Sequence, residues 1–132
     1  MRPLNKITYV DDEPDLRTVF CAILQKIGGI EVQACDCGRE ALECAPAFAP
    51  DLIVLDVMMP GMDGPAVFEK LQQLPELCDT PVIFMTAKAQ AAEIAALIEL
   101  GAVAVITKPF RTLSLPAQIE SIWAKCGQKA AA

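Results

Sequence analysis

Short apolar segments alternate with helical segments along the whole chain, and this alternation constrains the fold more than any other feature. Five segments have the length and composition of strands, at residues 5–10, 30–35, 51–56, 81–86 and 102–107. Each is followed by a segment of helical character, at residues 14–27, 38–45, 65–74, 89–100 and 112–126. Strict alternation predicts a doubly wound α/β fold, a mostly parallel sheet with helices on both faces.

Two segments carry the strongest local signals. The first helical segment has one apolar stripe at the period of a helix, made by Leu16, Val19, Phe20, Ile23, Leu24 and Ile27. Proline suits its first turn at Pro14, and the pair Gly28 and Gly29 ends it. Residues 51–56 form a near-continuous apolar run that ends in Asp56, which is typical of a parallel strand buried on both faces. Helix 38–45 is expected to stop near Pro46.

The length of 132 residues fits a single domain, residues 1–132, and 54% apolar residues are enough for a core. No apolar run approaches the roughly 18 residues of a membrane span. The first residues turn polar too early for a secretory signal. We therefore expect a cytoplasmic protein that does not insert into membranes.

Charge and cysteine usage exclude several classes of protein. The net charge is -6 and the eleven Lys and Arg residues are scattered, which argues against direct binding of nucleic acid. The six cysteines include no CxxC pair, and the chain has no histidine, so a zinc site is disfavoured. We expect reduced cysteines that pack as small apolar residues.

Acidic residues gather where apolar segments stop. Asp11 and Asp12 follow the first predicted strand, and Asp56 ends the third. In the strand order 2-1-3-4-5, known for doubly wound sheets, strands one and three are neighbours and these acids converge. Two carboxylates about 4 Å apart repel by about 4 kcal/mol at an effective dielectric constant near 20, so the cluster needs a cation or a proton. Mg²⁺, which prefers oxygen ligands, fits this need.

Helix capping is the alternative explanation for these acids. Asp12 could be the N-cap of the first helix. Capping does not explain Asp56, because this residue ends a buried strand. Two more polar residues, Thr86 after the fourth strand and Lys108 after the fifth, fall on the same edge of the sheet. They could supply a hydroxyl and a positive charge to phosphate oxygens.

The chain resembles bacterial response-regulator receiver domains, of the kind found in single-domain chemotaxis regulators. The resemblance covers about residues 5–125, and its motifs are VDDE, LDVMMPGMDG, MTA and TKPF, at residues 10–13, 55–64, 85–87 and 107–110. It implies a flavodoxin-like (βα)5 sandwich with strand order 2-1-3-4-5. It also implies a phosphorylation-dependent signalling switch of a two-component system or phosphorelay, rather than an enzyme with an external substrate.

The resemblance implies a role for each matching residue. Asp56 would accept the phosphoryl group, and Asp11, Asp12, Asp56 and the backbone carbonyl of Met58 would hold Mg²⁺. Lys108 would pair with the phosphoryl group, Thr86 would move toward it, and the Lys108–Pro109 peptide bond would be cis. The donor would be a phosphohistidine on a histidine kinase or a phosphotransfer protein, and the downstream target would be another, unidentified protein.

The sequence departs from the family pattern at one position. Many receivers have an aromatic residue three positions before the lysine, where this chain has Val105. We hypothesise that the output surface still includes the fourth helix, fifth strand and fifth helix, and that backbone shifts carry the signal. Met58 and Lys88 could flank the phosphoryl group and control access of water, although Lys88 could equally be an ordinary solvated lysine.

Three other functions compete with the switch. A magnesium-dependent phosphatase of the haloacid dehalogenase type would need Asp-x-Asp after its first strand. A flavodoxin-like cofactor binder would need a phosphate loop there in place of acids. A phosphorylation-independent interaction module on the same fold would not need the five site residues. The sequence also leaves open a stand-alone regulator, a relay intermediate and a fragment of a longer protein.

Overall fold

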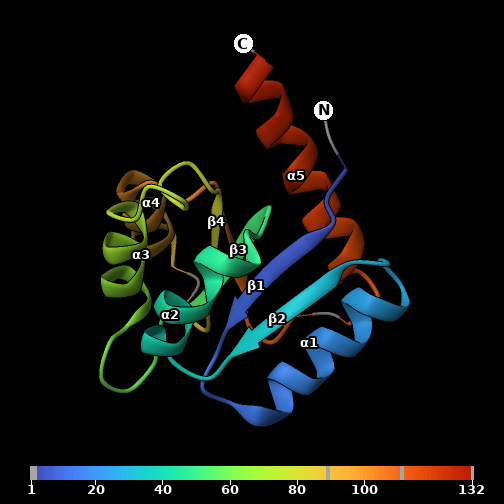
Figure 1. Ribbon diagram of the computed structural model, residues 1–132, viewed down its shortest axis with the longest axis horizontal. Helices are drawn as coiled ribbons and strands as arrows, with labels where there is room; N and C mark the ends of the chain where they lie inside the picture. The colour runs from blue at the N-terminus through green and yellow to red at the C-terminus, as the bar shows by residue number, and fades with distance from the viewer. Residues whose placement is uncertain (1–2, 89, 111, 132) are drawn as a thin grey trace.

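Five parallel strands form the centre of the molecule (Figure 1). The computed structural model describes residues 3–88, 90–110 and 112–131. The strand order is β2-β1-β3-β4-β5, and every neighbouring pair is parallel, as the alternation and the family resemblance predicted. The strands are β1 Lys6–Val10, β2 Glu31–Cys35, β3 Leu52–Asp56, β4 Val82–Thr86 and β5 Ala104–Thr107.

Helices cover both faces of the sheet, which is the predicted doubly wound flavodoxin-like arrangement. In Figure 1, α1 and α5 lie on one side, and α2, α3 and α4 lie on the other. Two separate clusters of buried residues, one on each face, form the core. The helices are α1 Pro14–Lys26, α2 Gly38–Phe48, α3 Gly64–Gln72, α4 Ala91–Leu100 and α5 Leu115–Ala131.

The predicted strands agree with the structure to within one residue, except β5, which starts two residues later than expected. The uninterrupted apolar run of the third strand is buried along its whole length. The edge strand β2 is largely accessible, in keeping with its mixed composition. Among the described residues, no helix has both the length and the apolar composition to cross a bilayer.

The prediction that the second helix stops near Pro46 is wrong. Helix α2 continues to Phe48, although proline removes one backbone hydrogen bond inside it. Tertiary contacts hold this last turn, because Ala45 is buried and Lys6 Nζ donates to the Phe48 carbonyl at 3.2 Å. The Lys6 ammonium also lies 5.2 Å from the centre of the Phe48 ring.

Boundaries of three other helices differ from the prediction, and α3 ends at Gln72 instead of residue 74. Helix α4 begins at Ala91 after the N-cap Gln90, and the predicted start at residue 89 lies outside the described residues. Helix α5 begins at Leu115 instead of residue 112, and it continues past residue 126 to Ala131. Its start places Pro116 in the first turn, where the fixed φ of proline and its missing N–H are tolerated.

Candidate functional site

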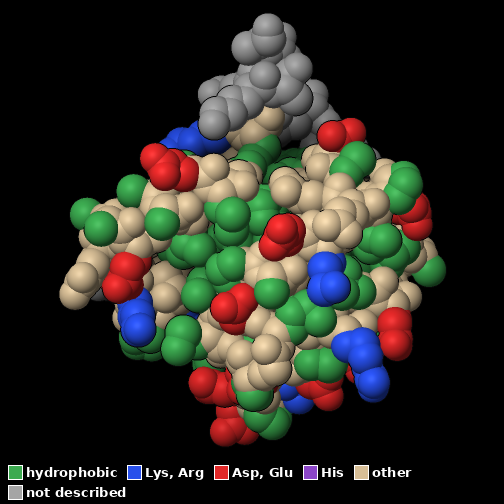
Figure 2. All heavy atoms as spheres, turned by 90° about the vertical axis from the view of Figure 1, so that its left-hand side faces the viewer, with side chains coloured by type: hydrophobic (Ala, Val, Ile, Leu, Met, Phe, Trp, Pro, Cys, Tyr) green, Lys and Arg blue, Asp and Glu red, His purple; other side chains and the backbone are tan. Residues whose placement is uncertain are grey.

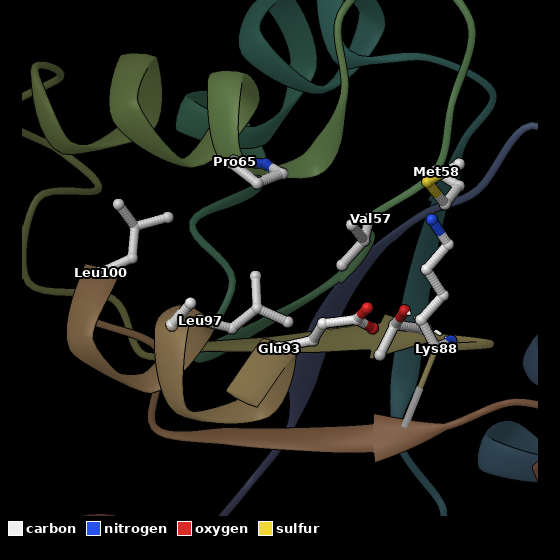
Figure 3. Close-up of a pocket in the computed structure, with 9 residues that line it drawn as sticks. Val57, Met58, Pro65, Lys88, Glu93, Leu97 and Leu100 are labelled. Carbon is white, nitrogen blue, oxygen red and sulfur yellow. Dashed lines mark hydrogen bonds between the residues drawn. The ribbon is translucent and has the colours of Figure 1, made fainter. Parts of the chain in front are cut away.

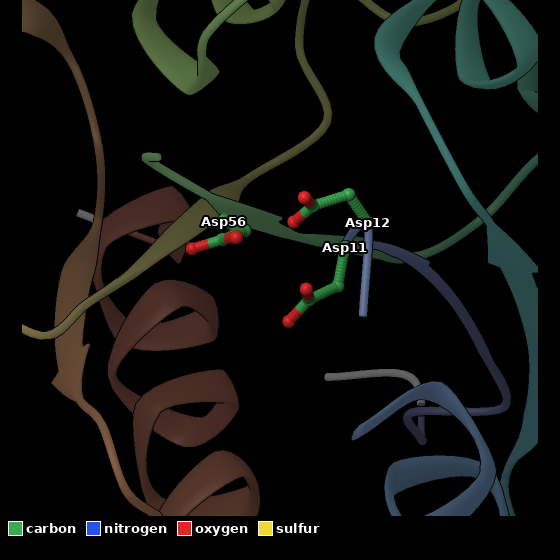
Figure 4. A group of neighbouring side chains, drawn as sticks. All are labelled: Asp11, Asp12 and Asp56. Carbon is green, nitrogen blue, oxygen red and sulfur yellow. The ribbon is translucent and has the colours of Figure 1, made fainter. Parts of the chain in front are cut away.

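The acids that the sequence predicted to converge lie together at the carboxyl ends of β1 and β3. These strands are neighbours, with Val10 opposite Leu55, so Asp11 and Asp56 come to the same edge. Carboxylate oxygens of Asp11, Asp12 and Asp56 lie within 4.8 Å of one another (Figure 4). Asp11 and Asp56 are buried, whereas Asp12 is exposed. The strand order therefore brings two buried carboxylates and one accessible carboxylate into one pocket.

Lys108 joins the two buried carboxylates. Its Nζ lies 3.0 Å from Asp11 Oδ2 and 3.1 Å from Asp56 Oδ1. The Lys108 backbone N–H donates to the Thr86 carbonyl at 2.9 Å, which fixes the chain after β5 against the end of β4. The Lys108–Pro109 peptide bond is cis, as the resemblance implied.

The pKa values show how strongly these charges interact. The pKa of Asp56 is raised to about 6, first by burial and then by the negative charge of Asp11, while Lys108 opposes the shift. Burial alone would lower the pKa of Lys108, but its hydrogen bonds and charge interactions with Asp11 and Asp56 outweigh burial and raise it. Lys108 is therefore held as a cation, and a further positive charge beside Asp56 would favour the ionised form of that carboxyl.

Asp11 is held by three further groups. The Tyr9 hydroxyl donates to Asp11 Oδ2 at 2.6 Å, and the Glu13 backbone N–H donates to Oδ1 at 3.0 Å. Arg17 Nη1 donates to the Asp11 backbone carbonyl at 2.8 Å. Tyr9 is not among the site residues predicted from the sequence. The sequence does contain a signal for this contact, because Tyr9 lies in a buried strand two residues before Asp11. Side chains two residues apart point to the same face, and a buried tyrosine hydroxyl usually needs a hydrogen-bond partner.

The capping alternative for Asp12 is wrong. The N-cap of α1 is Glu13, and its side chain makes no capping hydrogen bond. By contrast, Asp63 does cap α3, because its Oδ1 accepts from the Ala66 N–H at 3.0 Å. Asp12 therefore does not cap α1, and its carboxylate belongs to the acidic cluster.

The loop after β3 is folded back tightly onto Asp56. The Gly64 N–H donates to the Val57 carbonyl at 2.9 Å. A Cβ at Gly64 would lie 2.5 Å from the Asp56 carbonyl oxygen, well inside van der Waals contact. Only glycine fits at this close approach, so the start of α3 fixes the backbone that carries the Asp56 carboxylate.

Thr86 follows Met85, the β4 residue that pairs with Asp56. Met58 and Lys88 extend toward the same end of the sheet (Figure 3). Thr86 is buried at the end of β4, and its Oγ1 accepts from the Lys88 backbone N–H at 3.0 Å. All three residues line an open cavity of about 490 Å³ that extends along α4 to Leu97 and Leu100. Val105, at the position of the usual aromatic, is half-buried and packs against the core cluster under α2, α3 and α4.

Comparisons with known proteins identify the family. The model of the response regulator receiver domain matches residues 7–120. The chain is 41% identical over 117 residues to the probable transcriptional regulator ycf27 of Cyanophora paradoxa, and 38% identical over 117 residues to the alkaline phosphatase synthesis transcriptional regulatory protein PhoP of Bacillus subtilis. These matches cover 89% of this chain in both cases, and 47% and 48% of the two relatives. The chain therefore spans about half the length of the curated relatives it matches.

Solved structures agree with this assignment. The Vibrio cholerae chemotaxis protein CheY4 superimposes with a TM-score of 0.83 at 28% identity, over 91% of this chain and 99% of that one. The BeF3-activated receiver domain of Klebsiella pneumoniae RstA gives a TM-score of 0.77 at 30% identity, over 87% and 95% of the two chains.

Fold and site together define a doubly wound α/β signalling module with an acidic pocket at the ends of its central strands. The chain belongs to the response regulator receiver domain family. Receiver domains are signalling modules rather than catalytic enzymes, and they accept phosphoryl groups from histidine kinases. The pocket of Asp11, Asp12 and Asp56 with Lys108 is typical of the Mg²⁺-binding site of such a switch.

Proposed function

We propose that this chain is a phosphorylation-dependent switch in which Asp56 accepts the phosphoryl group. The observation that carries the proposal is the position of Lys108, whose Nζ lies 3.1 Å from Asp56 Oδ1 and 3.0 Å from Asp11 Oδ2. A lysine held between the acceptor and a neighbouring acid supplies positive charge where phosphoryl oxygens would gather. We further propose that residues 1–132 form one receiver domain, with its core at about residues 5–125.

The chemical step is a direct transfer to a carboxylate. A carboxylate oxygen of Asp56 attacks the phosphorus of a phosphohistidine, an O–P bond forms, and the P–N bond breaks. The electron pair of that bond returns to the imidazole of the donor, which leaves as the neutral ring because its other nitrogen carries a proton. Little covalent assistance is needed, so the protein contributes position and charge. Lys108 offers its ammonium to the oxygens, and the Thr86 hydroxyl can donate a hydrogen bond to them.

The donor set fits Mg²⁺. Asp11, Asp12 and Asp56 offer oxygen atoms within 4.8 Å of one another, and hard divalent cations prefer oxygen ligands. The residues proposed to hold the ion are these three acids and the backbone carbonyl of Met58. A bound Mg²⁺ would neutralise the negative charge that builds up around the transferred group.

The proposed donor is a histidine kinase or a histidine phosphotransfer protein, and the proposed target is a second, unidentified protein. The proposed response moves Thr86 toward the phosphoryl group and changes the surface of α4, β5 and α5. Val105 lacks the bulk of an aromatic ring, so the response in this chain would proceed through backbone shifts between β4 and α4. Phosphotransfer profiling against candidate kinases would identify the donor and distinguish a stand-alone regulator from a relay intermediate.

Phosphorylation of purified protein by a small donor tests the proposal. Incubation with Mg²⁺ and acetyl phosphate should add the mass of one phosphoryl group, measured by intact-protein mass spectrometry. The Asp56→Asn variant should gain no mass, whereas Asp79→Asn, a matched change at an exposed aspartate, should behave as the parent protein. A protein that gains no phosphoryl group under these conditions would instead be a phosphorylation-independent interaction module.

A second measurement tests the response. Hydrogen exchange of the protein with and without beryllofluoride, which imitates the phosphoryl group, reports changes in the backbone. We expect altered protection in the β4–α4 segment and along α4 and β5. An exchange pattern that is identical with and without the mimic would refute the proposed output surface.

A further inference from the structure

Tyr9 is a buried aromatic residue that contacts the acidic site from the core side. Its side chain is fully buried, and its ring stacks on Phe20 with the ring centres 3.9 Å apart and the planes 12° from parallel. Its hydroxyl donates to Asp11 Oδ2 at 2.6 Å, a short distance typical of a hydrogen bond to an ionised acceptor. The stacking fixes the ring, so this hydroxyl is a rigid donor aimed at a single carboxylate.

The donors around Asp11 differ in how firmly they are held. Oδ2 accepts from the Tyr9 hydroxyl and from Lys108 Nζ, and Oδ1 accepts from the Glu13 backbone N–H. An ionised carboxylate offers about four lone-pair positions, so three donors leave roughly one for a cation. Lys108 reaches the pocket on a long flexible side chain and also pairs with Asp56, whereas Tyr9 and the backbone N–H are fixed. The two fixed donors act on different oxygens and together determine the orientation of the carboxylate.

We infer that Tyr9 is a positioning residue for the cation: its hydroxyl holds Asp11 in the orientation that binds Mg²⁺ and keeps Oδ2 partnered when Lys108 turns to the phosphoryl group. This inference rests on the proposed function. A buried carboxylate oxygen that loses its donor carries a desolvation penalty, so a second, permanent donor makes the release of Lys108 easier. Outer partners of metal-binding carboxylates usually change metal affinity by an order of magnitude or more.

The test is Mg²⁺ binding by the Tyr9→Phe variant, measured by calorimetry in the absence of any phosphoryl donor. Phenylalanine keeps the ring and its stacking on Phe20 and removes only the hydroxyl. We expect Mg²⁺ to bind roughly tenfold more weakly, with the phosphorylation rate recovering when Mg²⁺ is raised to saturation.

Thr8→Val is the matched control. Thr8 is the neighbouring residue of β1, is equally buried, and donates to Gln33 Oε1 at 3.0 Å without contacting Asp11. The Thr8→Val change removes a partly buried hydrogen bond between β1 and β2. Both variants should therefore lose stability, but only Tyr9→Phe should lose Mg²⁺ affinity. Equal Mg²⁺ affinity in Tyr9→Phe and the parent protein would overturn the inference.

The parent protein offers a second test that does not depend on the folding of a variant. The chain contains a single tyrosine, so the tyrosine bands of its ultraviolet resonance Raman spectrum report on Tyr9 alone. Addition of Mg²⁺ should shift the bands that respond to hydrogen bonding of the hydroxyl. The Mg²⁺ concentration at half of this shift should equal the concentration that gives half-saturation in calorimetry. Mg²⁺ binding without any shift would overturn the role of Tyr9, whereas a parent protein that binds no Mg²⁺ would refute the metal site of the proposed function itself.

Discussion

Helix α4 packs less closely on the sheet than the helices of the opposite face do. On one face, α5 buries Leu115 and Ile119 completely, and α1 contributes Phe20, which stacks on Tyr9. On the other face, α4 buries only Leu97, at 9% exposure, among its ten residues. Most outward side chains of α4, apart from Glu99, are nevertheless apolar, and Ile98 and Leu100 are 44% and 45% exposed. Figure 2 shows hydrophobic side chains spread over the face that α2, α3 and α4 cover, with acidic and basic side chains interspersed among them.

The difference divides the site into a fixed side, formed by Asp11 and Tyr9, and an adjustable side, formed by Thr86 and the cavity along α4. Asp11 is anchored through Tyr9 to the aromatic stack beneath α1, so the cation-binding edge rests on closely packed core. Thr86 faces the open cavity along α4, where few buried contacts resist movement. Regions with few buried apolar contacts open and shift at low cost in free energy. This contrast suits a signalling module in which the cation-binding edge stays in place while the segment along α4 changes its conformation. Four substitutions test the contrast.

Removal of the Phe20 ring should have the largest effect. Phe20 is fully buried between Tyr9 and Phe110, so Phe20→Ala leaves a cavity in the fixed side of the core. We expect the free energy of unfolding to fall by about 3–5 kcal/mol in urea titrations followed by circular dichroism. A loss below about 1 kcal/mol would contradict the description of this face as closely packed.

Asp56→Asn should stabilise the protein in the absence of metal. Because the pKa of Asp56 is raised to about 6, the folded state binds this proton more tightly than the unfolded chain, in which aspartate titrates near 4. Stability from the protonated form is present below about pH 4 and is lost as the pH rises through about 6. Asparagine carries no charge, so we expect a gain of about 1–3 kcal/mol near pH 8 in EDTA that shrinks toward about pH 4.

The control for this change is Asp79→Asn, because Asp79 is exposed. Its effect should stay within about 0.5 kcal/mol at every pH. Thermal unfolding across the pH range measures both variants. A gain for Asp56→Asn that is independent of pH would show that the buried negative charge of Asp56 is not its cause.

Leu97→Ala tests the adjustable side. Leu97 is the single buried residue of α4 and already lines an open cavity, so truncation adds to existing space instead of creating a closed void. We expect a loss of about 2 kcal/mol, near the low end for leucine, in the same urea titration used for Phe20→Ala. A loss as large as that of Phe20→Ala would remove the contrast between α4 and the helices of the opposite face.

Ile98→Lys should have the smallest effect on stability. Its side chain is 44% exposed on the outer surface of α4, so the free energy of unfolding should change by no more than about 0.5 kcal/mol. The change would nevertheless alter any contact that a target makes with α4. A large destabilisation would show that α4 contributes more to the core than its single buried residue indicates.

The sequence predicted the parts of this protein that depend on local pattern. The strands follow from apolar runs, and the convergence of Asp11 and Asp56 follows from their positions at the ends of neighbouring strands. Their proximity to Lys108 follows from parallel topology in the same way, since the carboxyl ends of all strands meet at one edge. Family motifs added the strand order, which alternation alone does not determine.

Other features depend on contacts between distant residues, and pattern did not reveal them. Helix α2 passes Pro46 because Lys6, far away in sequence, holds its last turn. The contact between Tyr9 and Asp11 depends on a ring orientation that Phe20 fixes from α1. The capping alternative for Asp12 failed because the helix starts one residue later than that interpretation required.

The ion pairs of Lys108 have a consequence for the charge balance of the pocket. Three carboxylates and one ammonium leave two negative charges when all are ionised, which one divalent cation balances. Conversion of Asp56 to an aspartyl phosphate would replace about one negative charge by nearly two, so neutrality would be lost again. This extra negative charge would lie in a pocket that solvent screens poorly, so it would attract any nearby hydrogen-bond donor that can approach. Without phosphorylation, one divalent cation makes the pocket neutral. After phosphorylation, the same pocket with its cation would keep close to one negative charge, which a further donor would have to balance.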